Sequence, residues 1–361
     1  MGVNLKTKKQ SISFRILSQK NIKAMAAFLR KRGSREKFFS YSVSELIRFG
    51  FTHEELKVYK KGFRESAEIE MKLAVKNGVE LIFFNDIYYP PLLREIFEPP
   101  DYIYAKGDLE VLKSRMLAIV GSRKGSEYGK RSLSKITPDI SRSGITIVSG
   151  MAYGIDSMSH REAVASGGKT IGVNAGGLLK LYPSGNSTVI KNILDNGCVV
   201  SEFPLKTEPR PHLFPIRNRI IAGMSEAILV VEAEKKSGSL ITARLGLEQN
   251  RDIFSIPGKI DSTLSSGTNY LIQQGAKLIT TSNDILTEYG MKPKKRKRVF
   301  SHDLLPEELI LLDLMSGNGV NSINYFVEKT GNSVSQTLST LMGMVLKNLI
   351  TEEDGGFKKI I

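Results

Sequence analysis

The most regular pattern of apolar and polar positions lies between Leu117 and Leu286. Short apolar runs rich in β-branched residues alternate there with longer amphipathic stretches, which is the pattern of buried strands joined by helices. The predicted strands are LAIVG, ITIVSG, TIGVNA, CVVSEF, AILVVEA, DIFSIP and KLITT. The predicted helices include 127–141, 155–166, 187–196, 215–223, 239–250 and 268–274. This alternation predicts an α/β domain with a Rossmann-like, mostly parallel sheet and helices on both faces.

Residues 1–76 have the apolar spacing of several short helices separated by glycines, which predicts a small helical cap. A helix-hairpin-helix grip on phosphates is the alternative, suggested by Lys57, Lys60, Lys61 and Arg64. A clear hairpin signature is missing, so a packed cap is favoured. The connector 77–116 holds paired prolines, which favour extended or turn structure. We expect it to wrap an edge of the domain, which ends at residue 290.

Residues 291–298, MKPKKRKR, form a charge block with a proline, which is typical of a solvated linker. Residues 299–361 then predict three helices and a strand pair that turns at Gly355-Gly356, in the order of a winged helix. The helices are expected at 304–315, 320–330 and 333–348. This segment holds 4 basic and 8 acidic residues, and Lys347 is the only cation of its third predicted helix. Protein contact or regulation is therefore favoured over DNA binding.

Charge is unevenly distributed along the 361 residues, whose net charge is +15. Residues 1–76 hold 18 basic and 7 acidic side chains, and residues 291–298 hold 6 basic and no acidic ones. Residues 77–290 hold 24 and 22, and are nearly neutral. A polyanionic partner and plain solubility explain this balance about equally well. If the α/β domain binds anions, the local arrangement of a few side chains and N–H groups must hold them, because the net charge of the domain is close to zero.

Several other classes of protein lack their usual signals in this sequence. An apolar stretch of about 18 residues, which a membrane helix needs, is missing, and the basic N-terminus has no apolar signal core. We therefore expect a cytoplasmic protein with no membrane partner. The single cysteine, Cys198, excludes a disulfide framework and is expected in a buried strand. The four histidines are dispersed, so we expect no metal site.

Glycine-rich, basic and hydroxyl-bearing loops follow several of the predicted strands. Because parallel strands end at one edge of a sheet, ligands of such folds gather there, and helix starts at that edge favour anions. The candidate phosphate-binding residues are Gly121, Ser122 and Arg123, Gly150 and Gly154, Arg217, Asn218 and Arg219, and Lys235, Ser237, Gly238 and Arg244. Asp156 follows the second loop and is expected to orient it. Each loop alone is more often an ordinary turn, but several at one edge reverse that preference.

Catalytic signatures are missing. The first loop, GSRKGSEYG, lacks the spacing of dinucleotide-binding folds, and GGKT at 167–170 lacks the first glycine of a P-loop. His160 and Glu162 have the spacing of zinc deaminases, but no cysteine pair accompanies them. We therefore predict no catalytic residues, no metal and no cofactor.

The motifs in this region resemble the DprA family of DNA-processing proteins, also called Smf. The motifs that carry the likeness occur in order: IVGSR, SGMAYGID, YPSGN, SEFP, FPIRNRIIAG, VVEA, SGSLITAR, IPG, SGTNYLIQQGA and DIL. The likeness extends back to YPPLLREI. Departures include Met151 and Met224, where the family often has leucine, and VNAGGLL in place of a more regular turn. The cap resembles the family's sterile-alpha-motif-like (SAM-like) domain only loosely.

The resemblance implies an extended Rossmann fold, a homodimer and single-stranded DNA as ligand, with delivery of the strand to the recombinase RecA in natural transformation. It also implies that the candidate residues above contact the DNA, with Arg123 and Arg219 the strongest choices. Two other functions stay open. One is a nucleoside-phosphate enzyme of the phosphoribohydrolase type, although its PGG-x-GT turn is absent. The other is a regulator whose winged helix binds duplex DNA.

Overall fold

The computed structural model describes residues 5–32, 38–60, 63–291, 305–315, 319–346, 349–353 and 355–359. The chain divides into two compact units, Met1–Pro293 and Lys294–Ile361. Most of the predicted linker 291–298 lies outside the described residues, as do Lys61 and Lys347. The exact boundaries between the cap, the sheet domain, the linker and the winged helix therefore stay predictions.

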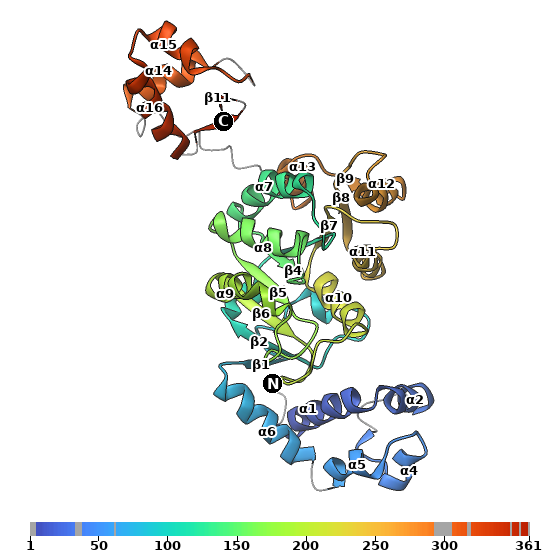
Figure 1. Cartoon of the computed structure of the whole chain (residues 1–361). Helices are drawn as coiled ribbons and strands as arrows, with labels where there is room; N and C mark the ends of the chain where they lie inside the picture. Colours follow the sequence, from blue (N-terminus) through green and yellow to red (C-terminus); the bar gives the residue numbers. More distant parts are fainter. Residues whose placement is uncertain are drawn as a thin grey trace. The chain divides into compact units, whose positions relative to one another are not determined.

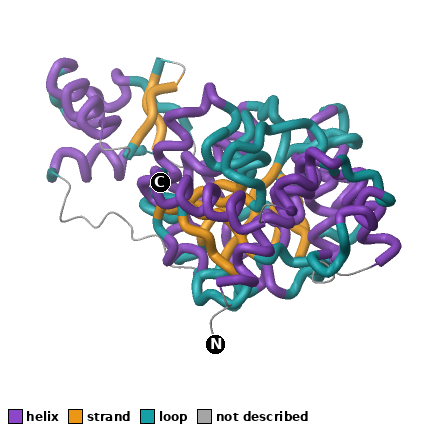
Figure 2. The backbone as a smooth tube through the Cα atoms, turned by 90° about the horizontal axis from the view of Figure 1, so that it is seen from below, coloured by secondary structure: helices purple, strands orange, loops and turns teal. Residues whose placement is uncertain are grey.

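A nine-stranded sheet forms the centre of the first unit, in the order β1-β2-β6-β5-β4-β3-β7-β8-β9. The seven strands from β6 to β9 are parallel, and β2 and β1 add to the β6 side as antiparallel strands. The strands are β1 Glu80–Phe83, β2 Tyr102–Gly107, β3 Met116–Val120, β4 Thr146–Ser149, β5 Thr170–Val173, β6 Gly197–Ser201, β7 Ala227–Val230, β8 Asp252–Ser255 and β9 Lys277–Leu278. Figures 1 and 2 show the sheet between its helices.

Helices cover both faces of the sheet because each parallel connection crosses over it. One face packs against α10 Leu213–Met224, α11 Gly238–Glu248 and α12 Ser266–Gln273. The other face packs against α7 Glu127–Arg142, α8 Ile155–Ala165, α9 Ser187–Asn196 and α13 Ser282–Glu288. The buried positions of α7, Leu133, Ile136 and Ile140, repeat at helical spacing, which explains why this segment is a helix.

The predicted fold class is confirmed, and all seven predicted strands and six predicted helices of the domain are present. Cys198 is buried in β6. The connector holds β2, which pairs with β6, so β1 and not β6 is the sheet edge. Helix α13 was not predicted; a capping box between Thr281 and Asp284 starts it.

The N-terminal segment is helical, with α1 Leu5–Lys20, α2 Ile22–Arg32, α4 Val43–Ile47, α5 His53–Lys60 and α6 Phe63–Lys76. Its own core is a cluster of aromatic rings, in which Phe28 and Phe38 meet edge to face with ring centroids 5.0 Å apart. Helices α1 and α6 also pack on the sheet through Ile12, Ala67 and Ala74. The cap is therefore fixed to the sheet by apolar contacts.

The second unit holds α14 Pro306–Leu314, α15 Ile323–Thr330 and α16 Val334–Leu346, followed by the antiparallel pair β10 Ile350–Glu353 and β11 Gly356–Lys359. These elements enclose a core of their own around Phe326, Leu341 and Phe357. Their order is the predicted winged-helix order. Throughout the described ranges, every helix is too short or too polar to span a bilayer.

Candidate nucleic-acid interface

A pocket of about 340 Å³ opens where the strand order reverses, between β3 and β7. Successive strands add on opposite sides of this point, so the loops that leave β3 and β7 separate and form a crevice. The lining residues come from the loop after β3, the turn after β4, the first turns of α10, and the loop that leads into α11. Among them are Gly121, Ser122, Arg123, Arg217, Asn218, Ser237 and Gly238. The structure thus brings seven predicted site residues together.

The N-terminus of α7, where a dinucleotide phosphate would lie in other Rossmann folds, is already occupied by Glu232. The backbone N–H of Ser126 donates to Glu232 Oε2 at 2.9 Å, and the hydroxyl of Ser126 donates to Glu232 Oε1. This carboxylate is 3% exposed, so it closes the helix end to outside anions. The structure thereby gives a physical reason for the missing dinucleotide signature.

The glycine loop after β4 is also filled by the chain's own groups. Gly154 has φ +75°, and a Cβ there would collide with the carbonyl oxygen of Ser122. At Gly150 a Cβ would lie 2.7 Å from both Arg217 and Asp156. Neither glycine lines the pocket among the residues described. Both instead permit the close packing that holds the first loop against the second.

Arg217 and Asp156 form the buried support of that loop. The guanidinium of Arg217 is 4% exposed and donates to the carbonyl oxygens of Gly150, at 2.7 Å, and Val173. Burial raises the pKa of Asp156 to about 6, while Arg217 acts in the opposite direction. Burial lowers the pKa of Arg217 to about 10. The contacts of Arg217 therefore fix the loop, and little of its side chain faces solvent.

The N-terminus of α11 faces the pocket, which the exposed Glu234 of the preceding loop also lines. Ser237 caps the helix by accepting from the N–H of Ser239 at 3.1 Å. The N–H of Gly238 donates to no acceptor among the described residues, as is usual for the first helical residue. Asn218 lies opposite, with its amide nitrogen 3.5 Å from the carbonyl oxygen of Gly238. A helix end of this kind favours an anion, and this one lies at the pocket.

Arg123 lies on the other wall of the pocket and is exposed. Its guanidinium carbon is 5.3 Å from the ring centroid of Phe214, which holds the charged group by a cation–π contact. Phe214 in turn meets Tyr182 edge to face, with centroids 5.6 Å apart, and Tyr182 is 39% exposed. A free cation, open amides and accessible aromatic rings thus occur together.

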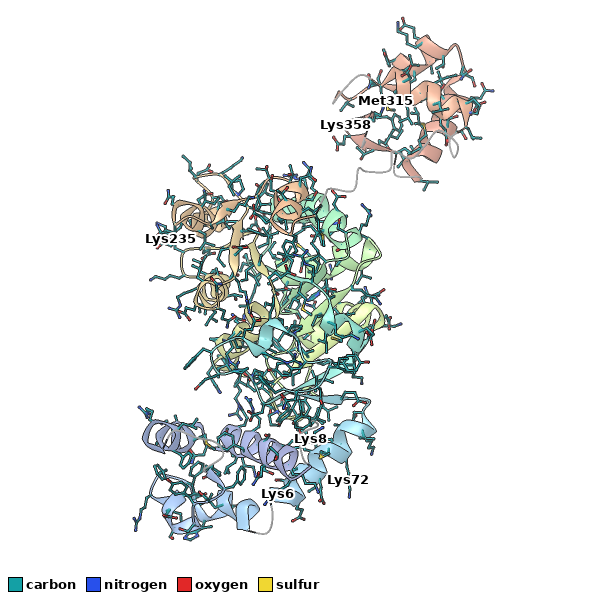
Figure 3. All side chains as sticks on the ribbon, turned by 180° about the vertical axis from the view of Figure 1, so that it is seen from behind. Lys6, Lys8, Lys72, Lys235, Met315 and Lys358 are labelled. Carbon is teal, nitrogen blue, oxygen red and sulfur yellow. The ribbon has the colours of Figure 1, made fainter. Side chains whose placement is uncertain are left out.

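Besides Gly150 and Gly154, three more predicted residues do not line the pocket, which corrects the expectation for Arg219 above all. Arg219 donates to a carboxylate oxygen of Glu202 and to the carbonyl oxygen of Glu98 at 3.2 Å. Arg244 pairs with Glu248 on the surface of α11 at 3.5 Å. Lys235 is exposed on the loop before α11, and Figure 3 labels it at the outside of that loop.

The residues that sequence reasoning missed are Lys124, Phe214 and Glu232. Lys124 and Phe214 line the pocket. Lys124 directly follows Arg123, and Phe214 opens the FPIRNR motif, so both stood beside chosen residues. Glu232 is the acidic residue of the VVEA motif, but nothing in the sequence indicates that it reaches across to Ser126.

The structure also bears on metal binding and on the protonation of His160. Within the described part of the chain, histidine, cysteine and acidic side chains form no group that could hold a metal ion. His160 is buried in α8 and its Nδ1 lies 2.6 Å from Thr170 Oγ1. Burial, and secondarily the charge of Arg217, lowers the pKa of His160 to about 3. The imidazole is therefore a neutral packing group.

Fold and pocket together define a Rossmann-like α/β protein with a crevice, lined by cations and a helix N-terminus, at the switch point of its sheet. The profile of the family described as DNA recombination-mediator protein A matches residues 80–290. The chain belongs to this family, whose members carry the names DprA and Smf. The predicted resemblance is thereby confirmed.

Relatives and solved structures agree with this assignment. The DNA processing protein DprA of Bacillus subtilis is 43% identical over 59% of this chain and 72% of its own length. Protein Smf of Escherichia coli is 34% identical over 82% of each chain. The crystal structure of DprA from Streptococcus pneumoniae covers 80% of this chain and 99% of its own, with a TM-score of 0.61 and 32% identity.

A second solved structure bears on the ligand. DNA processing protein A from Helicobacter pylori, described as having a unique single-stranded DNA binding mode, covers 58% of this chain and 95% of its own, with a TM-score of 0.53 and 28% identity. Since the family is one of recombination mediators, the prediction that the protein is not an enzyme is confirmed, and the phosphoribohydrolase alternative is set aside.

Proposed function

We propose that the pocket at the switch point binds the phosphates of single-stranded DNA. One observation carries this proposal: the exposed guanidinium of Arg123, in contact with the ring of Phe214, lines the same pocket as the N-terminus of α11, where the N–H of Gly238 has no acceptor among the described residues. A guanidinium and backbone N–H groups at a helix start are the usual donors to phosphate oxygens. The relative from Helicobacter pylori, described as binding single-stranded DNA, supports the choice of ligand.

A single strand suits this pocket better than a duplex. Its unpaired bases can stack on aromatic rings, which provides sequence-tolerant affinity. Phe214 and Tyr182 contact each other beside the pocket, and Tyr153 is 48% exposed in the neighbouring loop. A duplex hides its base faces and gains nothing from such rings.

The role that we propose for each residue depends on the contacts that it already makes within the protein. Arg123 and Lys124 supply charge, the N–H of Gly238 supplies a donor, and Asn218 and Ser237 supply polar side chains, while Gly121 and Ser122 form the backbone wall of the pocket, with the N–H of Ser122 already bonded to the carbonyl oxygen of Glu232 at 2.8 Å. Lys235 adds charge at the rim. Gly150, Gly154 and Arg217 act by fixing the loops. Arg219 and Arg244 already have acidic partners and are assigned to stability and surface pairing.

We further propose that the protein acts as a homodimer, protects the strand and loads RecA onto it, in natural transformation and recombination. The family description as a recombination mediator supports this role. A mediator must hold the strand without blocking the recombinase, and an open groove of phosphate contacts meets that requirement.

The test is equilibrium binding of the full chain to single- and double-stranded oligonucleotides across a salt series, followed by RecA filament assembly with and without the protein. We expect preference for the single strand, a steep loss of affinity with salt, and faster filament assembly. Preference for duplex would contradict the proposed ligand. Unchanged filament assembly would contradict the mediator role alone.

A further inference from the structure

A second cavity of about 360 Å³ lies where the N-terminal cap meets the sheet domain. Its lining comes from α1, from α6 and from the segment between β6 and α10. The cap and this segment belong to the same compact unit. They are also joined by an ion pair, in which Arg15 of α1 donates to Glu202 Oε2 at 3.0 Å. The cavity is therefore built by contacts within one unit.

Three cations line this cavity and form no ion pair with its acidic residues, although the charge of Lys20 also acts on Glu55 and helps to lower the pKa of that carboxyl. Lys20, Lys206 and Arg210 are exposed, and none forms an ion pair or side-chain hydrogen bond with any other described residue. Lysine and arginine side chains so near one another repel each other, and an anion between them removes that repulsion. The polar side chains of Gln19 and Thr207 line the same cavity.

The two acidic residues of the cavity are already engaged. Glu70 Oε1 accepts from the N–H of Leu205 at 2.7 Å and from the hydroxyl of Tyr104 at 2.9 Å. These two hydrogen bonds hold the buried carboxylate in place. Glu208 pairs with Lys180 at 2.7 Å. The three cations are left to attract a ligand, and the cavity favours an anion.

The second cavity adjoins the first at the start of α10. His212 and Leu213 line the second cavity, and Phe214, the next residue, lines the first. The segment 180–182 contacts both sides, because Lys180 pairs with Glu208 and Tyr182 packs on Phe214. Aromatic rings thus lie at the boundary between two groups of cations, an arrangement that fits a nucleic-acid strand.

We propose that this cavity is a second phosphate-binding subsite, which receives the continuation of the strand held at Arg123. The inference rests on the proposed function of the first pocket. It makes the cap, through Lys20 of α1, a part of the binding surface. A short strand fills the first pocket alone, and a longer one reaches both.

The experiment uses the full chain with Lys20→Ala, Lys206→Ala and Arg210→Ala combined, and oligothymidines of about 5 and about 16 nucleotides, within the range of common single-strand sites. We expect affinity for the longer strand to fall about tenfold, and the slope of log K against log salt to fall by about 2, at roughly 0.7 for each lost phosphate contact. Affinity for the shorter strand stays unchanged.

The matched control removes the same types of charge elsewhere, with Arg131→Ala, Lys135→Ala and Lys191→Ala on α7 and α9. We expect it to bind both strands as the unaltered chain does. Equal losses in the control, or equal losses for both strand lengths, would mean a general charge effect and would overturn the subsite.

The two proposals fail in different ways. If the triple variant binds the longer strand normally while Arg123→Ala weakens both lengths, the second subsite is wrong and the first pocket stands. If the unaltered chain binds neither strand, both proposals are wrong.

Discussion

At the residue scale, three arginines near the pocket differ in what their guanidinium groups already contact. Arg217 is buried against the carbonyl oxygens of Gly150 and Val173. Arg219 is paired with Glu202, which is 1% exposed. Arg123 is exposed and touches only the face of Phe214 among the contacts described. A strand can therefore recruit Arg123 without breaking an existing ion pair.

The first prediction concerns Arg123→Ala. We expect the affinity for a single-stranded oligonucleotide to fall about tenfold or more at moderate salt, since a charge-assisted hydrogen bond contributes about 1.5–3 kcal/mol. The melting temperature should stay within about 2 °C of the unaltered chain, because an exposed side chain adds little stability. Fluorescence anisotropy and calorimetry measure the two quantities.

Arg219→Ala is the comparison for this prediction. It leaves the buried Glu202 with Arg15 as its remaining cationic partner, so we expect a loss of roughly 1–3 kcal/mol in the free energy of unfolding. At a temperature where the variant is folded, it should bind DNA nearly as well as the unaltered chain. A larger loss of affinity for Arg219→Ala than for Arg123→Ala would contradict our assignment.

The second prediction concerns pH. Burial raises the pKa of Asp156 from 3.8 to about 6 in the folded protein. Between those values the folded state binds more protons than the unfolded state, so this group makes the protein less stable as pH rises from about 4 to about 6. The total effect is roughly 3 kcal/mol.

Asp156→Asn removes that titration. We therefore expect the stability of this variant, relative to the unaltered chain, to rise by up to roughly 3 kcal/mol between pH 4 and pH 7. Urea unfolding at several pH values measures the difference. A difference that does not change with pH would show that Asp156 is ionised throughout this range.

At the scale of elements, the helices that follow β3, β4 and β7 differ in what occupies their N-termini. Glu232 closes the start of α7, and Asp156 lies in the first turn of α8. The start of α11 carries only Ser237 as its cap. Because these helix ends differ in what occupies them, we place the proposed anion site at the start of α11.

The third prediction follows from the first of these helices. Glu232→Ala leaves the N–H of Ser126 without its acceptor, so we expect a loss of about 2–3 kcal/mol in the free energy of unfolding. Hydrogen exchange should speed up in the first turn of α7. Glu232→Gln keeps an acceptor oxygen and should lose less. If the alanine variant is as stable as the unaltered chain, Glu232 does not hold this helix end.

Much of this arrangement could be predicted from the sequence. Apolar periodicity located the seven parallel strands, because a buried strand and an amphipathic helix leave different patterns. It could not distinguish Arg123 from Arg219, since both are arginines in glycine-flanked loops or helix starts. Their difference depends on Glu202, which lies 17 residues from Arg219 in the sequence and meets it only through tertiary packing.

At the scale of the whole molecule, the second unit has the order of a winged helix but not the surface of a typical DNA reader. Its α16 exposes Val334, Leu338, Met342 and Leu346, which repeat at every fourth position. Residues 299–361 hold 4 basic and 8 acidic side chains. An apolar row in an acidic segment favours a protein partner over a phosphate backbone.

The fourth prediction is that the second unit adds little to strand binding. A chain that ends at Arg298 keeps the basic segment 291–298 and the whole first unit. We expect its affinity for single-stranded DNA to stay within a factor of about three of the full chain, or about 0.65 kcal/mol. A loss of a hundredfold, measured by anisotropy, would assign the main binding surface to the second unit.

The location of the strand on the full chain is the most direct test of the proposed binding site. A single-stranded oligonucleotide carrying bromodeoxyuridine is cross-linked by ultraviolet light, and the attached peptides are identified by mass spectrometry. We predict cross-links at Phe214, which is half-buried and lines the pocket, and at the exposed Tyr182 that packs on it. These should fall about fivefold in Arg123→Ala at a strand concentration equal to the Kd of the unaltered chain, as a tenfold loss of affinity requires. Cross-links confined to residues 305–359 would contradict the account.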